Sequence, residues 1–134
     1  MKNVIIMAFV LFGLTVSAES NAAYVGMDHS NNKVYCVDCG STGKEMLPVA
    51  NTTNGLFYNQ IIESPKYSFI REDLGTSCYA GGWFAINKAS SNPTAKKIPV
   101  GCEEISDIHA EYAKGITFLK IQYYSGKTKT YEFK

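Results

Sequence analysis

Four cysteines constrain this chain more than any other feature of its sequence: Cys36, Cys39, Cys78 and Cys102. An even number of cysteines in a short exported chain predicts two disulfides, and four cysteines allow three connectivities. We expect the pairs Cys36–Cys39 and Cys78–Cys102. The rival is a crossed arrangement, in which each of the first two cysteines joins one of the later two. A Cys78–Cys102 bridge closes a loop of about 25 residues, for which chain entropy predicts roughly 3 kcal/mol of stabilisation.

The N-terminal 18 residues predict export. Lys2 precedes an apolar run over residues 4–16, and Val16-Ser17-Ala18 places short side chains where a signal peptidase cleaves. The run is shorter than the roughly 20 residues that a membrane-spanning helix needs. We therefore expect a signal peptide over residues 1–18 and one disulfide-stabilised globular domain over residues 19–134, in a secreted or periplasmic protein. Such compartments are oxidising, which agrees with paired cysteines.

The Cys36-x-x-Cys39 spacing is also found in redox motifs and in zinc sites, but its surroundings favour neither. Residues 40–43 read Gly-Ser-Thr-Gly, which predicts a turn, whereas a catalytic pair stands at the N-terminus of a helix. Cys78 and Cys102 have no Cys or His at ligand spacing. We interpret Cys36–Cys39 as a staple at a turn between strands, and we expect no metal and no cofactor.

Charge excludes some classes of partner. Beyond Lys2 the chain carries 12 basic and 12 acidic residues, and Arg71 is its only arginine. Proteins that bind nucleic acid usually carry a stripe rich in Arg and Lys. We therefore expect no nucleic-acid partner and no strong attraction to an anionic membrane. No later apolar run is long enough to span a bilayer.

Aromatic and β-branched residues predict strands at many places along the chain. The expected strands are 24–27, 33–37, 46–50, 55–64, 67–72, 83–88, 116–124 and 128–133. Residues 73–77 read as a turn, residues 89–101 as a long loop, and Gly81-Gly82 as a bulge or a close approach of two backbones.

One helix is expected near the C-terminus, over residues 102–115. Ile105, Ile108 and Tyr112 fall on one helical face, and Gly115 is placed to end the helix. The predicted fold class is therefore α+β. It is a small, mostly antiparallel sheet or an OB-like, partly open barrel with one helix, stapled by disulfides. A curved sheet packed on the single helix is the alternative.

No residue of the chain has a clear catalytic setting. His109 is flanked by Asp107 and Glu111, but neighbours two apart on a helix do not face each other. No phosphate-binding glycine loop, nucleophile elbow or zinc-protease motif occurs. We expect a binding protein, not an enzyme. Because tyrosine and tryptophan are favoured anchors at recognition surfaces, the candidate ligand-binding residues are Trp83, Tyr79, Tyr123 and Tyr124.

Two kinds of partner are consistent with these features. Between Cys78 and Tyr124, the predicted order of strand, helix and strand is similar to that of the small OB-fold B subunits of AB5-type bacterial toxins. This likeness is one of element order, and it implies recognition of a glycan or cell-surface ligand, with a homo-oligomer as a compatible assembly. The alternative is a periplasmic inhibitor or immunity protein that blocks a hydrolase or toxin, for example by inserting loop 90–101 into a cleft of another exported protein.

Overall fold

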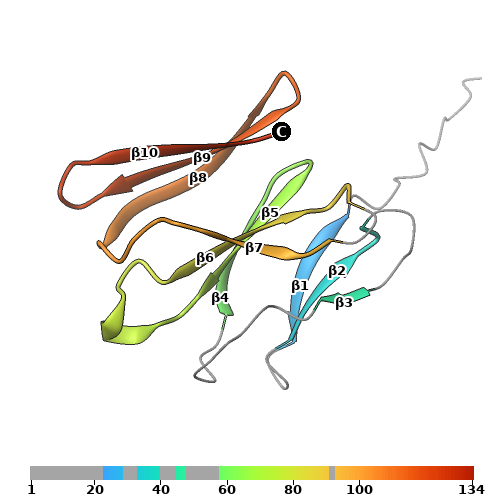
Figure 1. Ribbon diagram of the computed structural model, residues 1–134, viewed down its shortest axis with the longest axis horizontal. Coiled ribbons are helices and arrows are strands. Elements are labelled where there is room, and N and C mark those ends of the chain that lie inside the picture. The colour runs from blue at the N-terminus through green and yellow to red at the C-terminus, as the bar shows by residue number, and fades with distance from the viewer. Residues whose placement is uncertain (1–22, 29–32, 40–44, 48–57, 91–92) are drawn as a thin grey trace, which may run out of the picture.

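The computed structural model describes residues 23–28, 33–39, 45–47, 58–90 and 93–134, which form ten β-strands and one 3₁₀ turn (Figure 1). The strands are β1 (Tyr24–Asp28), β2 (Lys33–Val37), β3 (Glu45–Leu47), β4 (Tyr58–Glu63), β5 (Tyr67–Glu72), β6 (Gly82–Asn87), β7 (Ala95–Ile98), β8 (Ile105–Ala113), β9 (Ile116–Tyr123) and β10 (Thr128–Phe133). The 3₁₀ turn, η1, spans Gly75–Ser77.

Three antiparallel sheets are built from these strands, each from strands consecutive in sequence. The first sheet has the order β1-β2-β3, the central sheet β4-β5-β6-β7, and the C-terminal sheet β10-β9-β8. The central sheet contributes residues to two separate clusters of buried side chains, one shared with the first sheet and one with the C-terminal sheet. The molecule is therefore a layered β structure with the central sheet in the middle.

The composition of β6 explains why the central sheet is covered on both faces. Its sequence GWFAIN is buried from Gly82 to Ile86 without interruption. Since successive side chains of a strand point to opposite faces, Trp83 and Ala85 pack toward the C-terminal sheet, while Phe84 and Ile86 pack toward the first sheet. A strand that alternated apolar and polar residues would instead leave one face to water.

A polar contact joins the first sheet to the central sheet. The Glu63 carboxylate accepts hydrogen bonds from the Lys88 ammonium at 2.8 Å, the Ser68 hydroxyl at 2.6 Å and the Val25 backbone N–H at 2.9 Å. The Lys88 side chain is only 5% exposed, and its ammonium also donates to the Ser64 carbonyl at 2.6 Å. Glu63 thus provides the counter-charge of a buried cation.

Replacing Glu63 by alanine is expected to lower the free energy of unfolding by about 2 kcal/mol. The substitution leaves Lys88 buried without its counter-charge and removes the acceptor of Ser68; partial exposure of the Glu63 side chain, 40%, keeps the effect below that of a fully buried ion pair. Urea unfolding measures the change. Glu132→Ala, which removes an exposed carboxylate elsewhere, is the control and should shift stability by less than about 0.5 kcal/mol. Equal losses in the two variants would contradict the prediction.

The predicted helix over residues 102–115 is wrong, because Ile105–Ala113 forms strand β8. The chain then turns at Lys114 and Gly115, whose φ angles are 50° and 77°. Two positive φ angles in a two-residue loop form the type I′ turn that suits a β-hairpin. No α-helix occurs among the described residues, so this part of the chain is an all-β structure and not α+β.

The barrel and the toxin-like element order are also corrected. The described strands divide into three separate sheets and do not close into one OB-like barrel. The likeness to toxin B subunits needed a helix between two strands, and β8 occupies that place. The long loop predicted over residues 89–101 contains β7 at Ala95–Ile98.

Other predictions are confirmed or lie outside the described residues. The strand predictions agree with β1, β2, β4, β5, β6, β9 and β10 within a few residues, and with part of β3. Both predicted disulfides, Cys36–Cys39 and Cys78–Cys102, are present. The signal peptide over residues 1–18 and the turn over residues 40–43 fall on segments that the structure does not describe. Within the described segments, no helix is long and apolar enough to cross a membrane.

Candidate functional site

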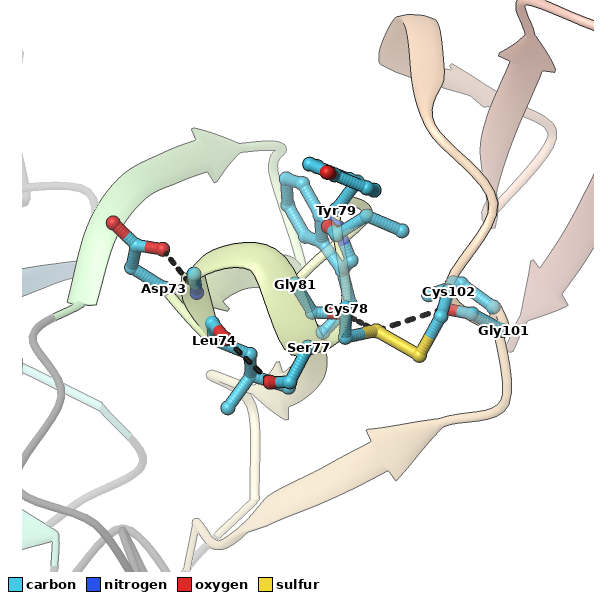
Figure 2. Close-up of a disulfide and its surroundings, with 12 residues drawn as sticks. Asp73, Leu74, Ser77, Cys78, Tyr79, Gly81, Gly101 and Cys102 are labelled. Atoms are coloured by element: carbon cyan, nitrogen blue, oxygen red, sulfur yellow. Dashed lines mark hydrogen bonds between the residues drawn. A yellow bond between two sulfur atoms is a disulfide. The ribbon is translucent and has the colours of Figure 1, made fainter.

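The loop between β5 and β6 is held in place by a disulfide and by its own hydrogen bonds (Figure 2). Cys78 is bonded to Cys102, in the segment that follows β7. The Gly75 N–H donates to an Asp73 carboxylate oxygen at 2.8 Å, and the Ser77 hydroxyl donates to the Leu74 carbonyl at 2.6 Å. The loop is therefore fixed both internally and to the next part of the chain.

Arg71 holds the same loop from the central sheet. Its Nε and Nη2 atoms donate to the carbonyls of Ala80 at 3.0 Å and Tyr79 at 2.9 Å, and its Nη1 donates to the Asn59 side chain at 2.9 Å. Gly81, with φ of 77°, lets two backbone segments approach each other: a Cβ there would lie 2.6 Å from the Glu72 carbonyl oxygen and 2.6 Å from the Arg71 Nε. The close approach predicted for Gly81-Gly82 is confirmed at Gly81.

This clamped loop presents Tyr79, whose side chain is 61% exposed. Tyr79 lines a cleft of about 410 Å³ between the central sheet and β8. The cleft has a polar part formed by Gln60, Arg71, Glu104, Ser106 and Asp107. Its smaller apolar part is formed by Ile105 and Ile108, which are partly exposed, whereas Ala80 and Trp83, each 1% exposed, contribute almost no surface. A cleft with an exposed aromatic ring, an apolar patch and several polar groups suits a small ligand that has both apolar and polar faces.

An irregularity in β8 shapes one wall of the cleft. The pairing of β8 with β9 shifts register between Ile105 and Asp107, which leaves Ser106 as an extra residue. The Ser106 hydroxyl donates to the Gln122 carbonyl at 3.0 Å. Such bulges re-aim side chains at the edge of a sheet. Ser106, Asp107 and Ile108 consequently line the cleft together, although they are consecutive in sequence.

The structure separates the four aromatic residues predicted to bind ligand. Tyr79 and Tyr124 are exposed, at 61% and 70%, whereas Trp83 and Tyr123 are buried, at 1% and 2%. The Trp83 indole N–H donates to the Ala80 carbonyl at 2.9 Å, and the Tyr123 hydroxyl donates to the Val100 carbonyl at 2.6 Å. Of the four, Tyr79 and Trp83 line the cleft, and Tyr79 alone brings an exposed ring to it.

None of the five polar lining residues was predicted to bind a ligand: Gln60, Arg71, Glu104, Ser106 and Asp107. Gln60 belongs to β4 and Arg71 to β5, whereas the other three lie at or just before the β8 bulge. They come together through the packing of two sheets, for which a local sequence pattern carries no signal.

His109 is oriented by two carboxylates, contrary to expectation. Its Nδ1 lies 2.9 Å from Asp107 Oδ2 and its Nε2 lies 3.1 Å from Glu111 Oε1. Residues two apart point to the same face of a strand, whereas they point apart on a helix. The expectation that neither carboxylate would reach His109 was therefore wrong, because this segment forms a strand. The hydrogen bonds to Asp107 and Glu111 raise the pKa of His109 above its ordinary value. This ring is half exposed and lies on the opposite side of β8 from Ile108 and the buried cluster.

The first disulfide belongs to the core of the protein. Cys36 and Cys39 are buried in the cluster between the first and central sheets. No cysteine of the described segments is free, and no group of His, Cys, Asp and Glu in them is arranged to hold a metal ion.

Comparisons with family models, with characterised proteins and with solved structures found no match to this chain.

Proposed function

We propose that this chain is a small exported, non-enzymatic binding protein that recognises a glycan of a cell surface through the Tyr79 cleft. The observation that carries the proposal is the exposed Tyr79 ring, held at a mixed polar and apolar cleft by the Cys78–Cys102 disulfide and by Arg71. Two disulfides are also the form expected of a protein that works in an oxidising, extracellular type of compartment.

A sugar ring fits the chemistry of this cleft. It offers an apolar face of C–H groups and an edge of hydroxyl groups. The apolar face can lie on the tyrosine ring, and the hydroxyl groups can exchange hydrogen bonds with the amide of Gln60, the hydroxyl of Ser106 and the carboxylate of Glu104. Binding to a loop that is already fixed avoids the entropy cost of ordering that loop.

Replacing Tyr79 by alanine is expected to weaken glycan binding by about tenfold or more, because an exposed aromatic anchor commonly supplies at least 1–2 kcal/mol. A broad glycan panel identifies the ligand, and isothermal titration calorimetry on the mature protein measures the change. Tyr79→Phe keeps the ring and should retain most of the affinity. Tyr124→Ala, which removes another exposed tyrosine, is the matched control and should bind like the natural protein. A panel without a single binder, or equal losses in Tyr79→Ala and Tyr124→Ala, contradicts the proposal.

The alternative is a periplasmic inhibitor or immunity protein. Its favoured inserting segment, residues 90–101, contains β7, but the stapled loop that carries Tyr79 is also suited to entering an enzyme cleft. Native mass spectrometry separates the two proposals. A closed ring of copies favours surface recognition, since linked weak sites gain avidity. A monomer that captures an exported hydrolase, with loss of capture in Tyr79→Ala, favours the inhibitor.

A further inference from the structure

The outer face of the C-terminal sheet carries an ordered set of polar side chains. By register, Asp107, Gln122 and Thr128 form one row across β8, β9 and β10. His109, Lys120 and Thr130 form the next row. All six point to the face opposite the buried side chains of Leu119 and Ile121, because neighbouring side chains of a strand alternate between faces.

These rows line a groove of about 290 Å³. Three of the side chains have groups free to bind a ligand: Gln122, Thr128 and Thr130 are exposed, and their side chains make no hydrogen bond to any other described residue. An amide and two hydroxyls supply both donors and acceptors. The groove is therefore ready to exchange hydrogen bonds with a polar ligand.

The groove adjoins the Tyr79 cleft. Asp107 lines both of them, and it stands at the bulge of β8, the edge strand of the C-terminal sheet. The three strands beneath the groove are spaced about 4.8 Å apart, so the groove alone crosses roughly 10 Å of sheet. A single sugar ring cannot fill both hollows, whereas a chain of sugars can.

Four charged residues line the groove, and three of them, Asp107, His109 and Lys120, already have partners of opposite charge. The fourth, Lys129, stands opposite the buried Ile121 in register, and its ammonium lies 5.8 Å from the centre of the Tyr123 ring. His109 is bonded to Asp107 and Glu111, and the Lys120 ammonium lies 2.7 Å from Glu111. A ligand with a strong charge would have to compete with these partners. An uncharged ligand can instead use the free amide and hydroxyl groups of Gln122, Thr128 and Thr130.

We infer that the groove is a second subsite, and that the ligand of the Tyr79 cleft is an uncharged oligosaccharide long enough to continue from the cleft across β8, β9 and β10. This inference rests on the proposed function, because it assigns a ligand length and charge to the same site. Gln122 and Thr130 hydrogen-bond the distal sugars, and Tyr79 holds the proximal one.

The test is a length series. Cello-, xylo-, manno-, malto- and chito-oligosaccharides of one to about six units are titrated into the mature protein by calorimetry. In the series that binds, Kd is expected to fall by about tenfold or more between the shortest and the longest oligomers, because the second subsite adds its contacts without a second association step. In Gln122→Ala/Thr130→Ala, the long oligomers should bind no better than short ones, and the affinity for short ones should be unchanged.

Thr94→Ala removes an exposed threonine hydroxyl that lies outside both hollows and should leave the whole series unchanged. Two results would overturn the second subsite and leave the proposed function standing. One is a Kd that does not vary with oligomer length, and the other is a length effect that persists in the double variant. Tighter binding of an acidic series, such as oligogalacturonates, overturns the assignment of an uncharged ligand. Failure of the folded protein to bind any oligomer of any length counts against both the second subsite and the proposed function.

Discussion

Replacing Trp83 by alanine is expected to lower the free energy of unfolding by about 4 kcal/mol, the range observed when a large aromatic core side chain is truncated. Trp83 is 1% exposed and packs in the cluster that joins the central and C-terminal sheets. Its removal leaves a cavity between the two layers. It also removes the indole N–H that donates to the Ala80 carbonyl, although Arg71 Nε still donates to that oxygen.

Urea unfolding of the mature protein measures this effect. The stability of Trp83→Phe should fall between those of the natural protein and Trp83→Ala, since phenylalanine keeps an aromatic ring but not the indole hydrogen bond. Tyr124→Ala, at a side chain 70% exposed, should change stability by less than about 0.5 kcal/mol. A loss below about 1 kcal/mol in Trp83→Ala would contradict the buried position of the side chain. Because this variant tests folding, its loss of glycan binding would say little about the cleft, and Tyr79 is the residue to change for that purpose.

Removing the Cys78–Cys102 disulfide with Cys78→Ala/Cys102→Ala is expected to cost about 3 kcal/mol, because the unfolded chain regains the freedom of a loop of about 25 residues. The native state should also lose order locally. The Ala80 N–H donates to the Cys102 carbonyl at 3.4 Å, and this contact depends on the two segments staying together. Tyr79 would then be presented less rigidly, and glycan affinity should fall with stability.

Urea unfolding and amide hydrogen exchange check this second prediction. Amides of residues 78–81 should exchange faster in the native state of the variant. Amides of the β9–β10 hairpin should remain more strongly protected than those of this loop. If neither stability nor exchange in the loop changes, the disulfide does not hold the loop, and Arg71 alone suffices.

The strands and disulfides could be predicted from sequence because their signals are local. β2 and β5 are short runs of aromatic and β-branched residues, and the even number of cysteines predicted two disulfides. The expected pairing is the one observed, although the sequence also allowed a crossed arrangement. β8 was misread because Ile105, Ile108 and Tyr112 match a helical face, and alanine and glutamate favour helices. Yet residues 107–112 alternate polar and apolar side chains along their whole length, and Lys114-Gly115 is a two-residue hairpin turn. The alternation was the stronger signal.

The candidate site was only partly predictable. Tyr79 could be chosen because tyrosine is a common anchor of recognition surfaces, but the same reasoning selected Trp83 and Tyr123, which are core residues. Residue type does not tell which ring faces water when a strand is buried on both sides. Gln60 and Asp107 are 47 positions apart in the chain and meet only because the central sheet packs beside β8.

The order of the strands within each sheet has a consequence for how fast the protein folds. Each of the ten described strands pairs only with the strand that precedes or follows it in the chain. Each pairing therefore closes a short loop, and the contact order of the hairpins is low for a β-protein, which favours rapid formation of the individual sheets. The long-range part of folding is the docking of the outer sheets on the two faces of the central one. We expect the transition state to lie at this docking step, with the contacts of Trp83 and Phe84 forming later than the hairpins themselves.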